Sequence, residues 1–116
     1  MARILIIEDE PLIAMMLQDW LGEMGYETVG PAGSVDEAIA VIDGSQLDAA
    51  LVDLHLRGVH AAAVVEHLNT VGVPFAVATG DTIPSGKDPL EGIPRLTKPY
   101  DFHSVQSTLA SLLQQA

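Results

Sequence analysis

Apolar residues occur along this chain in short continuous runs and in longer stretches with helical spacing, and the two kinds alternate. Two of the runs, residues 3–7 and 49–52, consist almost wholly of aliphatic residues and lead directly into carboxylates. Short apolar runs of this kind, bounded by turn residues, are typical of strands buried on both faces of a parallel sheet. Further strands are predicted at residues 26–31, 74–80 and 95–98.

Between these runs the apolar residues recur every three or four positions, which is the period of a helix with one buried face. Trp20 and the Met15–Met16 pair fall in the first such stretch and are expected in the core. The predicted helices run from Pro11 to a stop at Gly25, from a capping box at Ser34–Glu37 to Gly44, from about His60 to Val71, and onward from an N-cap at Asp101.

Strands that alternate with helices indicate βαβ units and an α/β fold. We predict a flavodoxin-like, doubly wound, five-stranded parallel sheet of order 2-1-3-4-5, formed by residues 1–116 as one domain. Proline inside a helix costs about 3 kcal/mol, and Pro84, Pro89 and Pro94 lie between the last two strands. The fourth helix is therefore expected to be short or missing, with residues 81–94 forming a mobile loop.

Composition and charge narrow the classes of function. The 116 residues include 48% hydrophobic residues and no cysteine, which excludes disulfides and thiol chemistry. Sixteen acidic residues against five basic ones give a net charge of −11, which disfavours binding to nucleic acid or to anionic membranes. That charge favours a basic protein partner or a divalent cation. Because no signal peptide or membrane-spanning run is present, a cytoplasmic location is expected.

Polar side chains follow the predicted strands at the edge where open α/β sheets bind their ligands. Glu8 and Asp9 follow the first strand, Asp53 ends the third, Thr79 ends the fourth and Lys98 ends the fifth. Three carboxylates placed together need a compensating charge, and an all-oxygen site suits Mg²⁺. A nucleophilic carboxylate, a metal, an ammonium and a hydroxyl are the groups that in-line phosphoryl transfer requires.

This pattern resembles the receiver domains of two-component response regulators, and the resemblance covers essentially the whole chain. It rests on Glu8-Asp9 after the first strand, Asp53 after the third, Thr79-Gly80 after the fourth and Lys98-Pro99 after the fifth. By this resemblance Asp53 is the phosphoacceptor.

The resemblance also implies roles for the surrounding residues. Asp9 would bind Mg²⁺ directly, Glu8 would assist through water, and the backbone carbonyl of His55 would be a further ligand beside Asp53. The remaining positions would act on the phosphoryl group or shape the chain around it: Thr79 and Lys98 by contacting it, Gly80 by keeping its approach open, and Pro99 through a cis peptide bond with Lys98.

The chain departs from the family pattern where phosphorylation is usually read out. Residues 74–80 are similar to a receiver subgroup with the signature Pro-Phe-x-Phe-Ala-Thr-Gly-Tyr, but Val77 replaces the second Phe and Asp81 the Tyr. Arg95 stands where many receivers carry an aromatic switch residue. We therefore expect residues 81–94 to become ordered or to shift on phosphorylation, in place of a coupled threonine–aromatic switch.

The leading interpretation is a stand-alone phosphoaspartate switch and not an enzyme with external substrates. Its phosphoryl donor would be a histidine kinase or a histidine phosphotransfer protein, and its output would be binding to an unknown downstream protein. Two alternatives stay open: the receiver fragment of a hybrid histidine kinase, and a Mg²⁺-dependent phosphatase with an aspartate nucleophile. Such a phosphatase usually has an acid two residues past the nucleophile, where this chain has His55. A flavin-binding electron carrier is disfavoured because the acids after the first strand would repel its phosphate.

Overall fold

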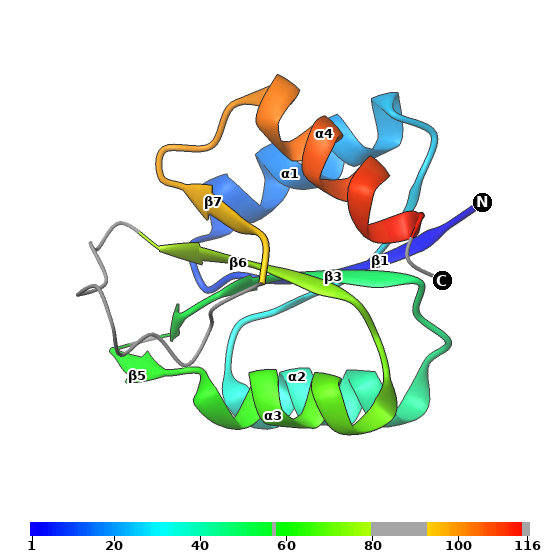
Figure 1. Ribbon diagram of the computed structural model, residues 1–116. Helices are drawn as coiled ribbons and strands as arrows, with labels where there is room; N and C mark the ends of the chain where they lie inside the picture. The colour runs from blue at the N-terminus through cyan, green and yellow to red at the C-terminus, as the bar shows by residue number, and fades with distance from the viewer. Residues whose placement is uncertain (57, 80–92, 115–116) are drawn as a thin grey trace.

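The computed structural model has a central parallel sheet with helices on both faces (Figure 1). It describes residues 1–56, 58–79 and 93–114. Within these ranges, residues 59, 60, 79 and 97 are described by their backbone alone. The elements are β1 (Arg3–Ile7), α1 (Pro11–Glu23), β2 (Glu27–Ala32), α2 (Val35–Gly44), β3 (Ala49–Asp53), β4 (His55–Leu56), β5 (Val59–His60), α3 (Ala62–Val71), β6 (Phe75–Thr79), β7 (Arg95–Thr97) and α4 (Phe102–Leu113). The sheet order β2-β1-β3-β6-β7 is the predicted one, once the small antiparallel pair β4–β5 is set aside.

Alternate residues of the central strands face opposite helical layers. On β1, Leu5 and Ile7 pack with buried residues of α2 and α3, whereas Ile4 and Ile6 pack with those of α1 and α4. Figure 1 shows these two layers on opposite sides of the sheet. Because every residue of β3 is buried, its sequence is a continuous apolar run until Asp53.

The first residues of α1, α2 and α4 follow the predicted signals. Pro11 is the first residue of α1. The side chain of Ser34 accepts a hydrogen bond from the Glu37 backbone N–H at 3.2 Å, and Asp101 accepts one from the Ser104 N–H at 2.8 Å. Among the described residues, no helix is both long enough and apolar enough to cross a membrane.

Helix α3 begins later than predicted, at Ala62, because the chain first forms a small hairpin. β4 pairs with β5 in antiparallel fashion, His55 opposite His60, around Gly58 with a φ of +79°. The Ala61 N–H then donates to the Leu54 carbonyl at 2.8 Å. Because His60 and Ala61 are held in this hairpin, they do not form the first turn of the helix as predicted.

Helix α1 confirms part of the core prediction, because Met16 and Trp20 are partly buried and pack against the core. Its buried residues are Ala14, Leu17 and Leu21. Met15, which we expected in the core, lies on the opposite side and is 59% exposed. Trp20 is half-buried, and its ring makes an edge-to-face contact with Phe102 of α4.

The segment before β7 falls mostly outside the described residues. This applies to Gly80 and to residues 81–92. The predicted short or missing fourth helix, and the loop expected in its place, therefore stay predictions.

Candidate functional site

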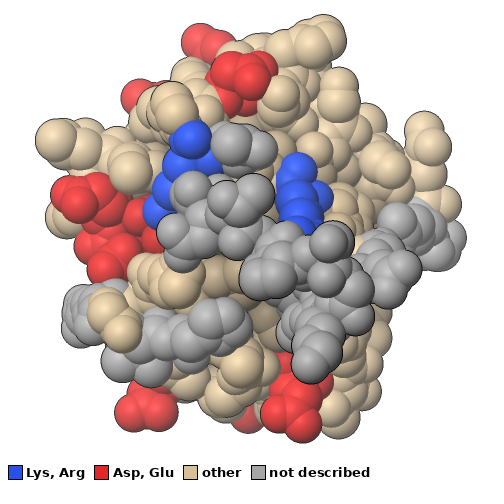
Figure 2. Space-filling view, turned by 60° about the vertical axis from the view of Figure 1, so that its left-hand side comes forward, with Lys and Arg blue, Asp and Glu red and all other residues tan. Residues whose placement is uncertain are grey.

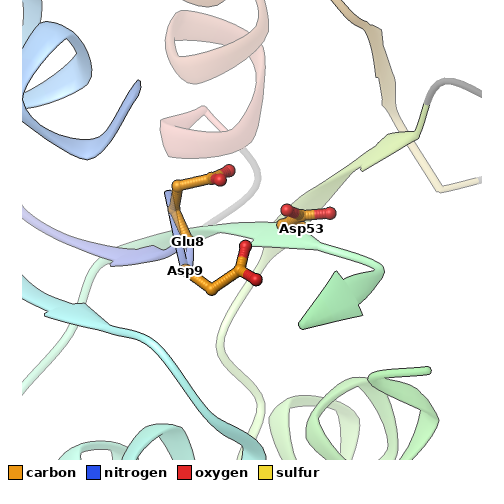
Figure 3. Close-up of side chains that lie close together, drawn as sticks. All are labelled: Glu8, Asp9 and Asp53. Atoms are coloured by element: carbon orange, nitrogen blue, oxygen red, sulfur yellow. The ribbon is translucent and has the colours of Figure 1, made fainter. Parts of the chain in front are cut away.

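The carboxyl ends of β1 and β3 bring three carboxylates together (Figure 3). Glu8 and Asp9 directly follow β1, and Asp53 is the last residue of β3. Because β1 and β3 are neighbours in the sheet, one oxygen of each carboxylate lies within 4.8 Å of the others. The structure therefore assembles the three acids that the sequence predicted as metal ligands.

Glu8 is a buried carboxylate, only 3% exposed. Its Oε1 accepts a hydrogen bond from the Glu10 backbone N–H at 3.1 Å, whereas Oε2 has no hydrogen-bond partner among the described residues. Burial raises the pKa of Glu8 to about 7, and repulsion by Asp53 adds to the rise, against the attraction of Lys98 and the Glu10 N–H. A buried carboxylate oxygen that lacks a hydrogen-bond donor is suited to a positively charged ligand.

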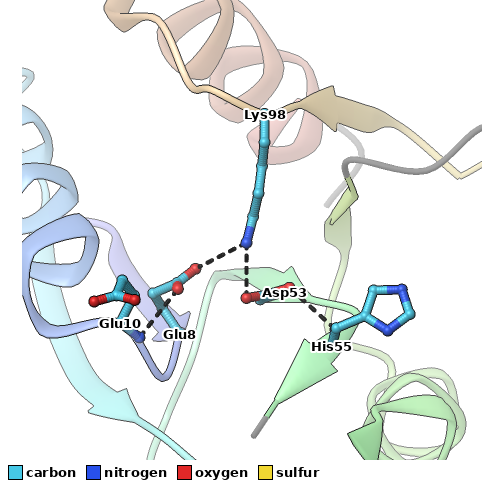
Figure 4. A network of polar contacts seen from close by, with 5 residues as sticks. All are labelled: Glu8, Glu10, Asp53, His55 and Lys98. Carbon is cyan, nitrogen blue, oxygen red and sulfur yellow. Dashed lines mark hydrogen bonds and ion pairs between the residues drawn. The ribbon is translucent and has the colours of Figure 1, made fainter. Parts of the chain in front are cut away.

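Asp53 is held by two donors at the centre of this network (Figure 4). Its Oδ1 accepts the backbone N–H of His55 at 3.0 Å, and its Oδ2 accepts Nζ of Lys98 at 2.9 Å. The same Nζ lies 3.8 Å from Oε2 of Glu8. Burial lowers the pKa of Lys98, but the hydrogen bond to Asp53 and the attraction of Asp53, Glu8 and Asp9 outweigh burial and raise it. Lys98 is therefore a fixed cation at neutral pH.

The donor set fits a hard divalent cation. Three carboxylates, Glu8, Asp9 and Asp53, face one ammonium group, so the cluster carries excess negative charge. Carboxylate oxygens are the ligands that Mg²⁺ prefers, and the unsatisfied Oε2 of Glu8 faces the same space. The carbonyl of His55 as a further ligand stays a prediction.

The strands on the other side of β3 place the remaining predicted residues at the same edge. Thr79 ends β6 and pairs with Thr97 of β7, directly before Lys98, but the structure describes Thr79 by its backbone alone. Its expected contact with a phosphoryl group stays a prediction, as does the role of Gly80. The Lys98–Pro99 peptide bond is cis, as the resemblance led us to expect.

Sequence reasoning missed Tyr100, which also belongs to this region. Its side chain is half-buried. Burial raises its pKa, with the negative charges of Glu8 and Asp53 contributing. The available signal was its position, two residues after Lys98.

The face at the carboxyl ends of the strands has a distinct charge pattern (Figure 2). Lys and Arg side chains lie near the middle of this view, with Asp and Glu toward its rim. On a chain with a net charge of −11, basic side chains thus gather near the middle of this face.

Comparison with known proteins shows the same type of domain. Residues 4–85 match the family model described as the response regulator receiver domain. SdrG from Sphingomonas melonis Fr1 is 39% identical, with a TM-score of 0.84 and 97% of each chain covered. The chain also shares its fold with the receiver domain of sensor histidine kinase PA1611 from Pseudomonas aeruginosa PAO1, which was solved with a magnesium ion in its active site cleft. The TM-score is 0.84 at 19% identity, and the match covers 97% of this chain and 98% of that one.

Among curated proteins, the transcriptional regulatory protein PdtaR from Mycobacterium tuberculosis is 32% identical over 86% of this chain. The match covers 51% of PdtaR. The chain thus spans about half the length of the curated relatives that it matches.

Proposed function

The chain belongs to the response regulator receiver domains, and from this premise we propose that Asp53 accepts a phosphoryl group from a phosphohistidine in a Mg²⁺-dependent step. The observation that carries the proposal is the convergence of Asp53, Glu8, Asp9 and Lys98 at one edge of the sheet. Buried carboxylates with so little compensation destabilise a fold, and such groups cluster at functional sites.

In the proposed reaction an oxygen of Asp53 attacks phosphorus as the P–N bond to the donor histidine breaks. The electron pair of that bond goes to the imidazole, which leaves as neutral histidine once its ring carries a proton. Nζ of Lys98 lies 2.9 Å from Oδ2 of Asp53, which supports a contact between Lys98 and the transferred oxygens. Asp9, Asp53 and the carbonyl of His55 would hold Mg²⁺ directly, with Glu8 assisting through water, and the ion would supply positive charge against the phosphoryl oxygens.

Receiver domains generally interact with histidine kinases and with downstream effectors. For this chain we propose a histidine kinase or histidine phosphotransfer protein as donor and a protein as target, with no nucleic acid or membrane partner and no turnover of external substrates. A cavity of about 430 Å³ between β7 and α4, bordered by Lys98 and His103, supports a target surface next to the acidic cluster. The cytoplasmic location stays a prediction.

Incubation with acetyl phosphate and Mg²⁺ tests the proposal, with intact-protein mass spectrometry as the readout. The expected product carries one acid-stable, base-labile phosphoryl group, and Asp53→Asn takes up none. Asp36→Asn is a matched control, because Asp36 is an exposed residue of α2. Full labelling of Asp53→Asn would overturn the assignment.

A further inference from the structure

Between two paired positions, strand β2 has one residue more than its partner strand β1. Leu5 of β1 pairs with Val29, but Ile7, two residues on, pairs with Ala32, three residues on. The extra residue is a β-bulge at Gly30–Pro31. It turns Ala32 onto the same face of the sheet as Val29, where Ala32 is 1% exposed and packs in the cluster that contains Ile7.

The bulge depends on the absence of a side chain at residue 30. Gly30 has a φ of +93°, and a Cβ built there would lie 2.9 Å from both the Ile6 carbonyl oxygen and the Ala32 backbone nitrogen. Both contacts are with backbone, so neither can be relieved by a side-chain rotation. The two strands can approach this closely only with glycine at this position.

The bulge connects directly to the acidic cluster. The Glu8 backbone N–H donates to the Ala32 carbonyl at 2.9 Å, immediately before the chain reaches Asp9. Ala32 is therefore the last contact of the edge strand with the segment that carries two of the three clustered carboxylates.

We propose that Gly30 is a positioning residue for the metal site: its bulge places the Ala32 carbonyl so that Glu8 and Asp9 are held in a binding geometry before the cation arrives. The inference rests on the proposed Mg²⁺ site. Groups that orient metal ligands typically change metal affinity by roughly 10–100-fold when they are altered. The edge strand β2, which contributes no carboxylate to the cluster, thereby takes part in cation binding.

The test compares Gly30→Ala with two other glycine substitutions. Gly25 and Gly72 also have positive φ values, +89° and +81°, but a Cβ at either meets nothing within 4 Å. Gly25→Ala and Gly72→Ala therefore carry a similar backbone strain without displacing a neighbouring strand. All three variants should lose stability, but only Gly30→Ala should raise the Kd for Mg²⁺, by about tenfold or more.

Isothermal titration with MgCl₂ gives the Kd, and circular dichroism shows that each variant is folded under the same conditions. A second measurement uses the unmodified protein, in case Gly30→Ala does not fold. In metal-free protein, hydrogen exchange at the Glu8 amide should be as slow as at Ile6 within β1, because both are held by the sheet. Rapid exchange at Glu8 would show that the link to Ala32 is not maintained and would overturn the inference.

The outcomes separate the inference from the proposal beneath it. If the unmodified protein binds no Mg²⁺, the proposed metal site and the inference both fail. If the unmodified protein and folded Gly30→Ala bind Mg²⁺ with the same Kd, the site stands and the positioning role of Gly30 is wrong. A weaker Kd in all three glycine variants would trace the loss to general strain and also contradict the inference.

Discussion

The parallel strands begin at one side of the sheet, here called the amino edge, and end at the opposite side, the carboxyl edge. The two carry similar residue types, but these residues differ in their exposure to water. At the amino edge, Nε of Arg3 lies 3.3 Å from Oε2 of Glu27, and the two side chains are 37% and 55% exposed. At the carboxyl edge, Nζ of Lys98 lies 2.9 Å from Oδ2 of Asp53, whose side chain is only 3% exposed. Both are pairs of a basic and an acidic side chain, yet only the second is removed from water on its acidic side.

This difference in burial distinguishes an ordinary surface ion pair from a site that can bind a ligand. An exposed ion pair gains little, because water already solvates both charges. A buried carboxylate loses that solvation and must be compensated by the protein. At the carboxyl edge compensation is incomplete, since Lys98 serves both Asp53 and Glu8, and Oε2 of Glu8 has no hydrogen bond among the described residues. The carboxyl edge therefore favours a cation, whereas at the amino edge the carboxylate of Glu27 is solvated.

The largest expected effect on stability comes from removing the ammonium at the carboxyl edge. Lys98→Met leaves Asp53 and Glu8 buried without their cation, and loss of one partner from such a pair costs roughly 3 kcal/mol. Urea unfolding at pH 8 in EDTA, followed by the fluorescence of the single tryptophan, Trp20, measures it. Arg95→Met is the matched control, because Arg95 is an exposed residue at the other end of β7. Equal stability of Lys98→Met and the unmodified protein would remove the energetic difference between the edges.

Mg²⁺ should act on the carboxyl edge alone. A ligand that binds only the folded state at 100 times its Kd stabilises that state by about 2.7 kcal/mol. Asp9→Ala should abolish this gain and raise metal-free stability, because it removes one of three clustered charges. Asp48→Ala, whose carboxylate accepts the Arg3 N–H at the amino edge, should keep the full response. Melting temperatures with and without MgCl₂ decide this, and an unchanged response in Asp9→Ala would place the metal elsewhere.

The residues at the carboxyl edge were predictable from sequence because the order of the strands alone determines which residues meet there. In a parallel sheet, strands that end at or directly before Glu8, Asp53 and Lys98 bring those residues to one edge, whatever the details of packing. The bulge at Gly30 was not predictable, because it depends on the carbonyl of Ile6 in a neighbouring strand.

Local tertiary contacts account for the other differences. The hairpin of β4 and β5 forms from two residues on each side, too few to give a periodic pattern. Met15 is apolar and lies within a helical apolar pattern, yet the packing of α1 on the sheet buries Ala14 and Leu17 in its place. Periodicity located the helix but did not fix the width of its buried face.

Per unit of pH, a smaller effect should appear in the pH dependence of metal-free stability. Burial and Asp53 raise the pKa of Glu8 from 4.5 to about 7, so the folded state retains a proton that the unfolded state has lost between these values. The contribution of Glu8 is therefore favourable at low pH and is lost as pH rises through this window, at up to about 1.4 kcal/mol per pH unit. Urea unfolding across this range in EDTA, with Glu8→Gln as reference, isolates the effect. A constant difference between the two proteins would contradict it.

The smallest effect should come from the amino edge, and salt makes it diagnostic. Glu27→Gln removes one charge of the pair with Arg3. The Nε atom of Arg3 is buried and makes no hydrogen bond within the described residues, but the side chains of Arg3 and Glu27 are 37% and 55% exposed, so the loss should lie between about 0 and 1 kcal/mol. In 1 M NaCl the screening length falls to about 3 Å, which should remove even this difference. The effect of Lys98→Met should persist in the same salt, because Asp53 and Glu8 are shielded from solvent. Urea unfolding of the three proteins at low and high salt gives the comparison. If the Lys98 effect is screened as fully as the Glu27 effect, the carboxylates at the carboxyl edge are solvated and the two edges do not differ in kind.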